Sequence, residues 1–227
     1  MQQYLPYFRQ CLLFERIDDA GLIKTLNCLN AQLIPCEKGK VVLRQGDIPR
    51  YFGVLVRGGI NVIASDPSGN HSVMWSVGEG ELFGETYASA GVEALPSSFV
   101  AAQDSLVLIL EYERVINGCR NNGCLAHSYM VTNLIKSIGR KNLLLTQKLE
   151  LVSQRTTRDK LMAYLRAQHK EAKADRFVIP YDRQTLADYL GVERSAMSAE
   201  LSKMKKDGLI DYTRNEFEIL PFAGHTV

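Results

Sequence analysis

The chain has 227 residues, of which 46% are hydrophobic and 23% charged, and a formal net charge of +2. This composition is ordinary for a globular protein with one large domain or two smaller ones, and the charge permits nucleic-acid binding without requiring it. No apolar run is long enough to cross a bilayer, and Arg9, Glu15 and Arg16 interrupt the N-terminal segment, so we expect a cytoplasmic protein with no membrane partner.

The first thirty residues are predicted to form short helices, because apolar residues recur every three or four positions in LPYFRQCLLFERI and DDAGLIKTLNCL. From Leu33 the pattern changes to short apolar or alternating runs, separated by turn signals such as Gly58-Gly59 and Gly78-Glu79-Gly80. Many short strands at this spacing predict an antiparallel barrel or roll. We place this domain at residues 1–112.

Residues 113–152 are predicted to contain a long helix, because the stretch from about Cys124 to Val152 has no proline. Its apolar residues lie close to a heptad seam, which would consist of Val131, Leu134, Ile138, Leu145, Leu149 and Val152, flanked by Ile135 and Asn142. The helix is longer than a compact domain of this size needs, which favours a seam between two copies of the chain. A core helix packed on its own roll is the alternative.

Residues 153–227 are predicted to form a winged helix-turn-helix domain. A helix over about Thr157–Lys173 is followed by a short strand, RFVIP. Asp182 is then a good N-cap for a helix ending at Leu190, and Gly191 has the backbone freedom that a tight turn needs. A generic pair of amphipathic helices is the alternative at this point.

A second helix, from about Arg194 to Lys206, is predicted to enter the major groove of DNA. Its inward face would be Met197, Leu201 and Met204, whereas its outward face carries Ser195, Ser198, Ala199 and Ser202. Short side chains let a helix approach base edges, and an arginine near its N-terminus can reach guanine O6 and N7. Two strands, LIDYT and EFEIL, would form a wing that places Arg214 against phosphate.

Over essentially its whole length the chain resembles the Crp/Fnr superfamily, whose members include the cyclic-AMP receptor protein. KGKVVLRQGD, VLVRGGINV and DPSGNHSVMWSVGEGELFGE resemble the family's roll, and LADYLGVERSAMSAELSKMKKDGLI resembles its recognition motif. The resemblance implies an α+β fold with a cyclic-nucleotide-binding-like jelly roll, a long dimerisation helix and a C-terminal winged helix-turn-helix. It also implies a homodimeric, non-enzymatic transcription regulator that binds a near-palindromic operator in double-stranded DNA and contacts RNA polymerase.

The resemblance assigns roles to individual residues of the DNA-binding part. Arg194 corresponds to the family's base-contacting arginine, and Ser195 and Ser198 to neighbouring groove-facing positions. Arg183 and Gln184 correspond to residues that hold the phosphate backbone. Where the family commonly has a second arginine, this chain has Ala199, so its operator is expected to differ from the family's best-known site.

The family's cyclic-nucleotide binders use a Gly-Glu pair and an Arg-Ser pair to hold the ribose and the cyclic phosphate. This chain keeps Gly84 and Glu85 but has Pro96-Ser97 in the second place. A buried phosphate without its arginine is destabilising by roughly several kcal/mol, so we expect an unidentified small effector other than cyclic AMP. The residues expected to bind it are Gly84, Glu85, Ser97, Ser98, Trp75 and Tyr87. The alternative for the two aromatic residues is that they only fill the roll.

Two other kinds of protein are alternatives to a regulator controlled by a small effector. A redox- or haem-dependent regulator of the same fold would use cysteines or His71, but Cys11, Cys28 and Cys36 are too widely spaced for an iron-sulfur cluster, which leaves the Cys119 and Cys124 pair as a candidate for oxidation. A cupin-like metal enzyme needs converging histidines, and the four present are far apart in the sequence. We therefore assign no metal site and no certain cofactor.

Overall fold

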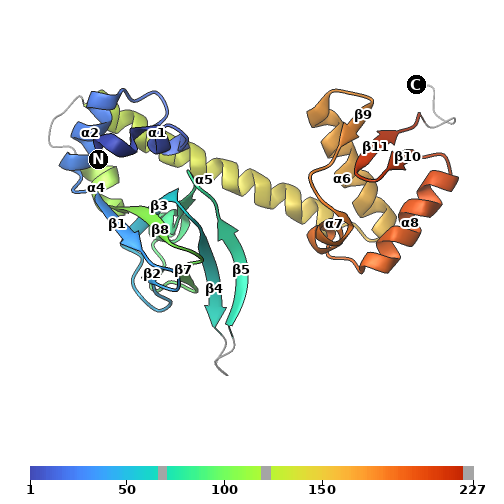
Figure 1. Cartoon of the computed structure of the whole chain (residues 1–227), viewed down its shortest axis with the longest axis horizontal. Coiled ribbons are helices and arrows are strands. Elements are labelled where there is room, and N and C mark those ends of the chain that lie inside the picture. The colour runs from blue at the N-terminus through green and yellow to red at the C-terminus, as the bar shows by residue number, and fades with distance from the viewer. Residues whose placement is uncertain (66–70, 119–123, 222–227) are drawn as a thin grey trace. The chain divides into compact units, whose positions relative to one another are not determined.

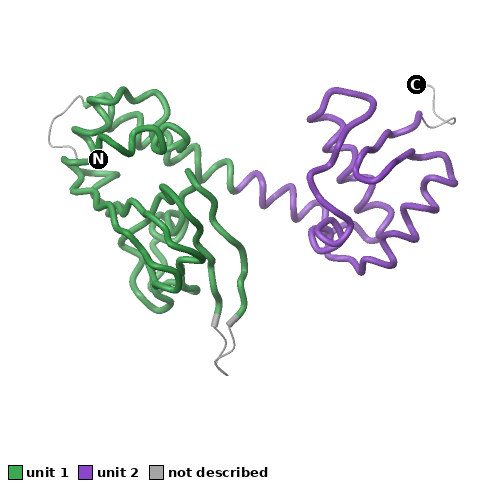
Figure 2. Tube along the Cα trace, in the orientation of Figure 1, with its two compact units in different colours: residues 1–141 green, residues 142–227 purple. Residues whose placement is uncertain are grey.

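The structure is a computed structural model that describes residues 1–65, 71–118 and 124–221. These residues divide into two compact units, residues 1–141 and residues 142–227 (Figure 2). Each unit has its own apolar core. None of the helices in the described ranges combines the length and the apolarity that a membrane crossing requires.

Unit 1 contains an antiparallel β-roll, as the spacing of short strands predicts (Figure 1). One sheet has the strand order β1 (Gln32–Cys36), β8 (Ser105–Glu111), β3 (Tyr51–Arg57), β6 (Leu82–Phe83). The other has the order β2 (Val41–Leu43), β7 (Ser98–Ala101), β4 (Ile60–Ser65), β5 (His71–Val77). Every strand pair in these sheets is antiparallel.

Strand β3 lies between the two cores of the roll. Phe52, Val54 and Val56 belong to a cluster shared with the helices, whereas Leu55 belongs to the cluster between the sheets. This alternation follows from the two-residue period of side chains along a strand. At Gly53 a Cβ atom would overlap the Phe83 ring, so the glycine provides the space for that ring.

Unit 1 also contains short helical elements. They are the 3-10 turns η1 (Gln2–Tyr4) and η2 (Leu12–Phe14) and the helices α1 (Leu5–Phe8), α2 (Asp19–Cys28), α3 (Glu85–Ala90) and α4 (Tyr112–Asn117). The first predicted helix is split into α1 and η2, because Cys11 between them adopts an extended backbone. Asp18 caps α2 by accepting a hydrogen bond from the Gly21 N–H at 2.6 Å.

The long predicted helix is present as α5 (Leu125–Val152). In its first half Met130 and Leu134 are fully buried in the helix-side core of unit 1. The side-chain amide of Asn133 donates to the carbonyls of Leu13 and Glu15 at 3.2 and 2.8 Å. This half of α5 is therefore a core helix of the roll unit.

The placement of Leu134 on a dimer seam was wrong, because its side chain is fully buried in the core of its own unit. Ile138 packs against the same core but is only half-buried, so its place on a seam stays a prediction. A heptad seam and the buried stripe of a core helix share the same three- and four-residue spacing, which is why the pattern alone did not separate them. The apolar side chains that α5 leaves exposed are Leu125, Ile135, Leu143, Leu144, Leu145 and Leu149, each about two-thirds exposed.

Unit 2 contains the elements predicted for residues 153–227. They are α6 (Thr157–Ala172), β9 (Arg176–Val178), α7 (Arg183–Leu190), α8 (Arg194–Lys206), β10 (Ile210–Thr213) and β11 (Glu216–Ile219). The strands form one antiparallel sheet in the order β10, β11, β9. Its core packs α6, α7 and α8 together through Leu161, Leu165, Leu186, Met197, Leu201 and Met204.

We expect Leu134→Ala to lower the free energy of unfolding of unit 1 by about 2–5 kcal/mol, because the truncation leaves a cavity beneath α5. Lys136→Ala, on the exposed side of the same helix, is the matched control and should change stability by less than about 0.5 kcal/mol. Denaturant titration followed by the fluorescence of Trp75, the single tryptophan, reports on this unit. Equal stabilities for the two variants would contradict the packing of α5.

Candidate nucleic-acid interface

Helices α7 and α8 form a helix-turn-helix whose ends are fixed by local signals. Asp182 caps α7, its carboxylate accepting from the Thr185 N–H at 2.8 Å, and this hydrogen bond lowers the pKa of Asp182. Gly191 ends α7 with a φ of +61°, a left-handed conformation that glycine adopts without strain. The cap of α8 is Glu193, which accepts from the Ala196 N–H at 3.0 Å.

Glu193 is a capping residue that the sequence did not lead us to expect. Its signal was an acidic side chain directly before the first helical residue, at a position where serine, threonine, asparagine or aspartate is more usual. Its carboxylate also accepts a hydrogen bond from the Ser195 hydroxyl, and these hydrogen bonds hold the pKa of Glu193 below its ordinary value. Glu193 is thus occupied by its own helix, and no ion pair within the described residues involves Arg194.

Helix α8 has the two faces that its sequence predicts. Met197, Leu201 and Met204 are buried, whereas Arg194, Ser195, Ala199 and Ser202 are exposed and Ser198 is half-buried. The Ser198 hydroxyl donates to the Arg194 carbonyl at 2.9 Å, and the Ser202 hydroxyl donates to the Ser198 carbonyl at 3.0 Å. Because both protons are used within the helix, the two serine oxygens remain available as hydrogen-bond acceptors.

The wing is the hairpin of β10 and β11, which turns at Arg214 and Asn215. Arg214 is exposed and has a φ of +53°. Arg183 holds this turn: its Nη2 donates to the Arg214 carbonyl at 2.8 Å, and its guanidinium lies about 5 Å from the ring centres of Tyr212 and Phe217.

Arg183 is half-buried, and this burial lowers the pKa of its guanidinium. Its Nη1 is buried without a hydrogen-bond partner in the part of the chain that the structure describes. Gln184, the next residue, is exposed, and its side-chain amide donates to Asp188 at 2.9 Å. Two residues at the start of α7 were predicted to contact phosphates. Gln184 is exposed, whereas Arg183 is hydrogen-bonded to the wing turn.

The residues predicted to bind an effector lie in unit 1. Gly84 has a φ of +80° and precedes α3, and Glu85 is 1% exposed. Lys141, on α5, reaches Glu85 Oε1 at 2.5 Å and also donates to the Leu82 carbonyl at 2.7 Å. The second carboxylate oxygen of Glu85 is buried without a partner among the described residues. Lys141 is a neighbour of this site that the sequence analysis did not predict.

The remaining predicted effector residues are distributed between the interior and the surface of the roll. Ser97 is buried, and the Ser98 hydroxyl accepts from the Gln45 N–H at 2.9 Å. The Tyr87 ring lies 6.3 Å from the Phe99 ring, and burial together with the charge of Glu85 raises the pKa of Tyr87. Trp75 lies on the edge strand β5 and is 47% exposed, whereas the other five residues are buried or half-buried.

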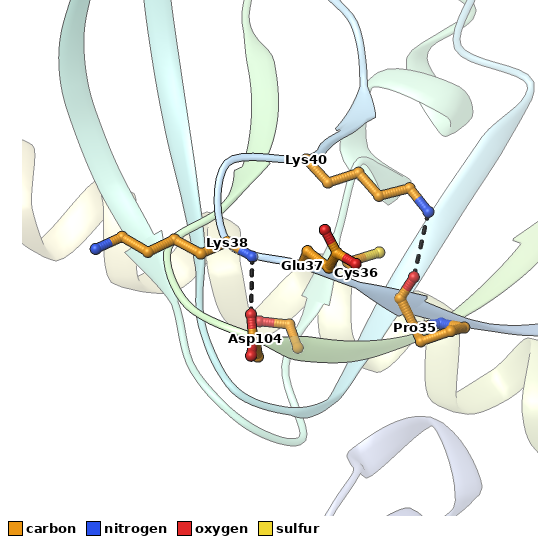
Figure 3. A pocket seen from close by; sticks show the side chains of 7 residues that line it. Pro35, Cys36, Glu37, Lys38, Lys40 and Asp104 are labelled. Carbon is orange, nitrogen blue, oxygen red and sulfur yellow. Dashed lines mark hydrogen bonds between the residues drawn. The ribbon is translucent and has the colours of Figure 1, made fainter.

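An open hollow beside the β1–β2 turn is separate from these residues (Figure 3). It is lined by Pro35, Cys36, Glu37, Lys38, Lys40, Asp104 and Ser105. The Lys40 amine folds back to donate to the Pro35 carbonyl at 3.2 Å, and the Asp104 carboxylate accepts from the Lys38 N–H at 3.0 Å. None of the residues predicted to bind an effector lines this hollow, and we assign it no ligand.

The thiols and histidines give no further site within the described ranges. No group of three or more histidine, cysteine or acidic side chains suited to a metal ion lies among the residues that the structure describes. Cys11 is buried, and this burial raises the pKa of its thiol to about 12, which disfavours the nucleophilic thiolate. Cys119 and the side chain of His71, both considered for redox or haem chemistry, lie outside the described residues.

Family models of known domains match both the roll and the helix-turn-helix part of the chain. Residues 33–122 match the family model of the cyclic nucleotide-binding domain, and residues 159–224 match that of the Crp-like helix-turn-helix domain. No curated protein compared with the chain matches it.

Among solved structures, CprK in complex with OCPA aligns over 86% of this chain and 88% of its own, with 15% identity and a TM-score of 0.59. The c-di-GMP-responsive global regulator CLP of Xanthomonas campestris aligns over 90% of this chain and 100% of its own, with 19% identity and a TM-score of 0.53. At these identities the structural likeness shows only that the folds are alike. The family is shown by the two matching domain models, which follow each other in this order along one chain. The chain belongs to the Crp/Fnr family of DNA-binding transcription regulators.

Proposed function

We propose that this regulator is a homodimer that reads a near-palindromic operator with α8 and responds to a small molecule other than cyclic AMP. The observation that carries base reading is the outer face of α8, where the exposed Arg194 is followed by the small side chains of Ser195, Ser198, Ala199 and Ser202. A helix with so small an outer face can lie deep in the major groove, which brings an arginine at its start to a guanine edge.

The other residues of the interface take roles that follow from their chemistry. The oxygens of Ser195, Ser198 and Ser202 can accept from base amino groups, and the Ala199 methyl can contact a thymine methyl. Gln184, which precedes α8 in the chain, and Arg214, which follows it, are both exposed. Both would contact phosphates. Arg183 supports the same phosphate contact, because it holds the backbone of Arg214.

We propose that α5 forms the dimer interface through the apolar face that the structure leaves exposed. Ile135, Leu145 and Leu149 are each about two-thirds exposed, and Asn142 is exposed between them. Their spacings of seven, three and four residues are those of a two-stranded heptad seam. Two copies joined there would present two α8 helices to half-sites about one turn of DNA apart. The regulator would act on DNA in the cytoplasm and contact RNA polymerase, as its family membership implies.

For the effector we propose the region around Gly84, Glu85, Ser97 and Ser98, with Tyr87 and, from the exposed edge strand β5, Trp75 as further contacts. Pro96 occupies the position of the phosphate-binding arginine, and the one cation that reaches Glu85 within the described residues, Lys141, is already paired with that carboxylate. A cyclic phosphate would therefore be buried without a free positive charge, which disfavours it by roughly several kcal/mol. A neutral or weakly charged ligand avoids this penalty.

Arg194→Ala should weaken operator binding by about 1–3 kcal/mol per half-site and relax the preference at one base pair, because the guanine contact is lost. Arg183→Ala is the comparison: it should weaken binding to all sequences alike, because it loosens a phosphate contact. Binding-site selection followed by salt-dependent affinity measurements distinguishes the two. If Arg194→Ala kept the wild-type consensus, base reading would have to reside elsewhere on α8 or in DNA shape.

Replacing Ile135 and Leu149 together by glutamate should convert the dimer into monomers, because charges would face each other across the seam. Gln147→Glu is the control: this exposed residue lies on the opposite side of α5 in the heptad, so the added charge should leave the dimer intact. Light scattering gives the mass of each variant. A dimer that survives the double substitution would show that the two copies associate through another surface.

Cyclic AMP should neither bind tightly nor change DNA affinity. Isothermal calorimetry with the full chain should show no saturable heat, and the operator affinity should be the same with and without the nucleotide. Pro96→Arg tests the cause, since restoring a guanidinium should improve binding of the cyclic phosphate if its absence is what excludes it. Micromolar binding to the unmodified chain would overturn this prediction.

A further inference from the structure

Arg158, on the first turn of α6, makes two ion pairs, one with the recognition helix α8 and one with its C-cap. Its Nε lies 2.5 Å from Glu200 Oε1, and its Nη2 lies 2.6 Å from Asp207 Oδ2. The three side chains are 32%, 22% and 38% exposed, so the network is partly shielded from water. These hydrogen bonds raise the pKa of Arg158 above its ordinary value.

The Arg158 guanidinium contacts α8 at two positions along the helix axis, Glu200 and Asp207. Glu200 lies within α8, and Asp207 is its C-cap, seven residues or about two turns further on. The apolar contacts of α6 with α8, through Leu161 and Leu165, hold the helices together but are not directional. A planar guanidinium has donors at fixed angles, so it opposes both rotation and sliding of α8.

The carboxylates of Glu200 and Asp207 do not by themselves stabilise α8. A carboxylate at the C-terminal end of a helix interacts unfavourably with the helix dipole, and Asp207 occupies that end. Both carboxylates also add negative charge to the helix that must approach phosphates. The pairing with Arg158 offsets both effects, and it does so from a different helix.

We infer that Arg158 is a positioning residue for sequence reading, which holds α8 in the rotation that points Arg194 and its small neighbours at base edges. Side chains project outward from a helix axis, so their ends move when the whole helix rotates. A modest rotation of α8 about its axis would therefore carry the Arg194 guanidinium away from a guanine edge. The same rotation would leave non-specific attraction between positive side chains and phosphates largely unchanged. Loss of Arg158 should therefore lower specificity more than it lowers affinity for arbitrary DNA. This inference rests on the proposed base reading by α8.

The experiment compares the affinities of the full-length protein for a selected operator and for a scrambled duplex. In Arg158→Met the ratio of operator to scrambled affinity should fall about tenfold, the size expected when a coupled network is broken. Arg158→Lys keeps the charge but lacks the planar fork, and its ratio should also fall severalfold. Arg176→Met is the matched control: it removes one positive charge from the same unit and breaks the Arg176–Glu218 pair, with little effect on the ratio.

A triple variant, Arg158→Met with Glu200→Gln and Asp207→Asn, separates positioning from charge neutralisation. Positioning predicts that its ratio stays low although the repulsive carboxylates are gone. Full recovery of the ratio would overturn the inference, and so would a wild-type ratio in both Arg158→Met and Arg158→Lys. Circular dichroism identifies any variant that does not fold; if Arg158→Met does not, the charge-conserving Arg158→Lys decides. Failure of the wild-type protein to prefer any operator would instead count against the proposed base reading by α8.

Discussion

Burial of the inner face of α5 is the contact on which the rest of the molecule depends. Met130 and Leu134 lie in the core of unit 1, and Leu151 of the same helix lies in the core of unit 2. Lys148, between them in the sequence, lies 3.3 Å from the ring centre of Tyr189 at the end of α7. A single helix thus supplies side chains to both cores, and removal of its apolar stripe would weaken each of them.

The apolar core and the polar contacts have different tasks in unit 2. Burial of Leu186, Leu201 and Phe217 brings the helices and the wing sheet together, but it does not by itself define where each helix begins or how it is rotated. The starts of α7 and α8 are set by the carboxylates of Asp182 and Glu193. Arg183 then donates a hydrogen bond to the wing turn, and Arg158 pairs with Glu200 of α8 and with its cap, Asp207. The proposed base reading would need such directional contacts, because a base contact depends on the placement of single atoms.

Unit 1 contains a partly buried ion pair between a helix of the roll and α5. Glu85 is buried, and an isolated buried carboxylate is strongly destabilising unless a cation pairs with it. Lys141 supplies that cation from α5, so the pair is neutral overall and is linked to the helix that also reaches unit 2. If the proposed effector binds at Glu85, this ion pair is its direct link to α5. Any such control requires a ligand that favours one of two arrangements of the chain.

The sequence by itself determined the features whose signals lie within one or two turns of chain. The bounds of α8 agree with the prediction, as do the cap at Asp182, the turn at Gly191 and the inward methionines, because caps, turn glycines and helical periodicity are local. Only the tertiary structure decided that Leu134 faces its own roll, that Lys141 pairs with Glu85 across 56 positions and that Arg158 pairs with Glu200 across 42. No local pattern marks such pairs, because partners far apart in sequence meet only after the apolar cores have packed.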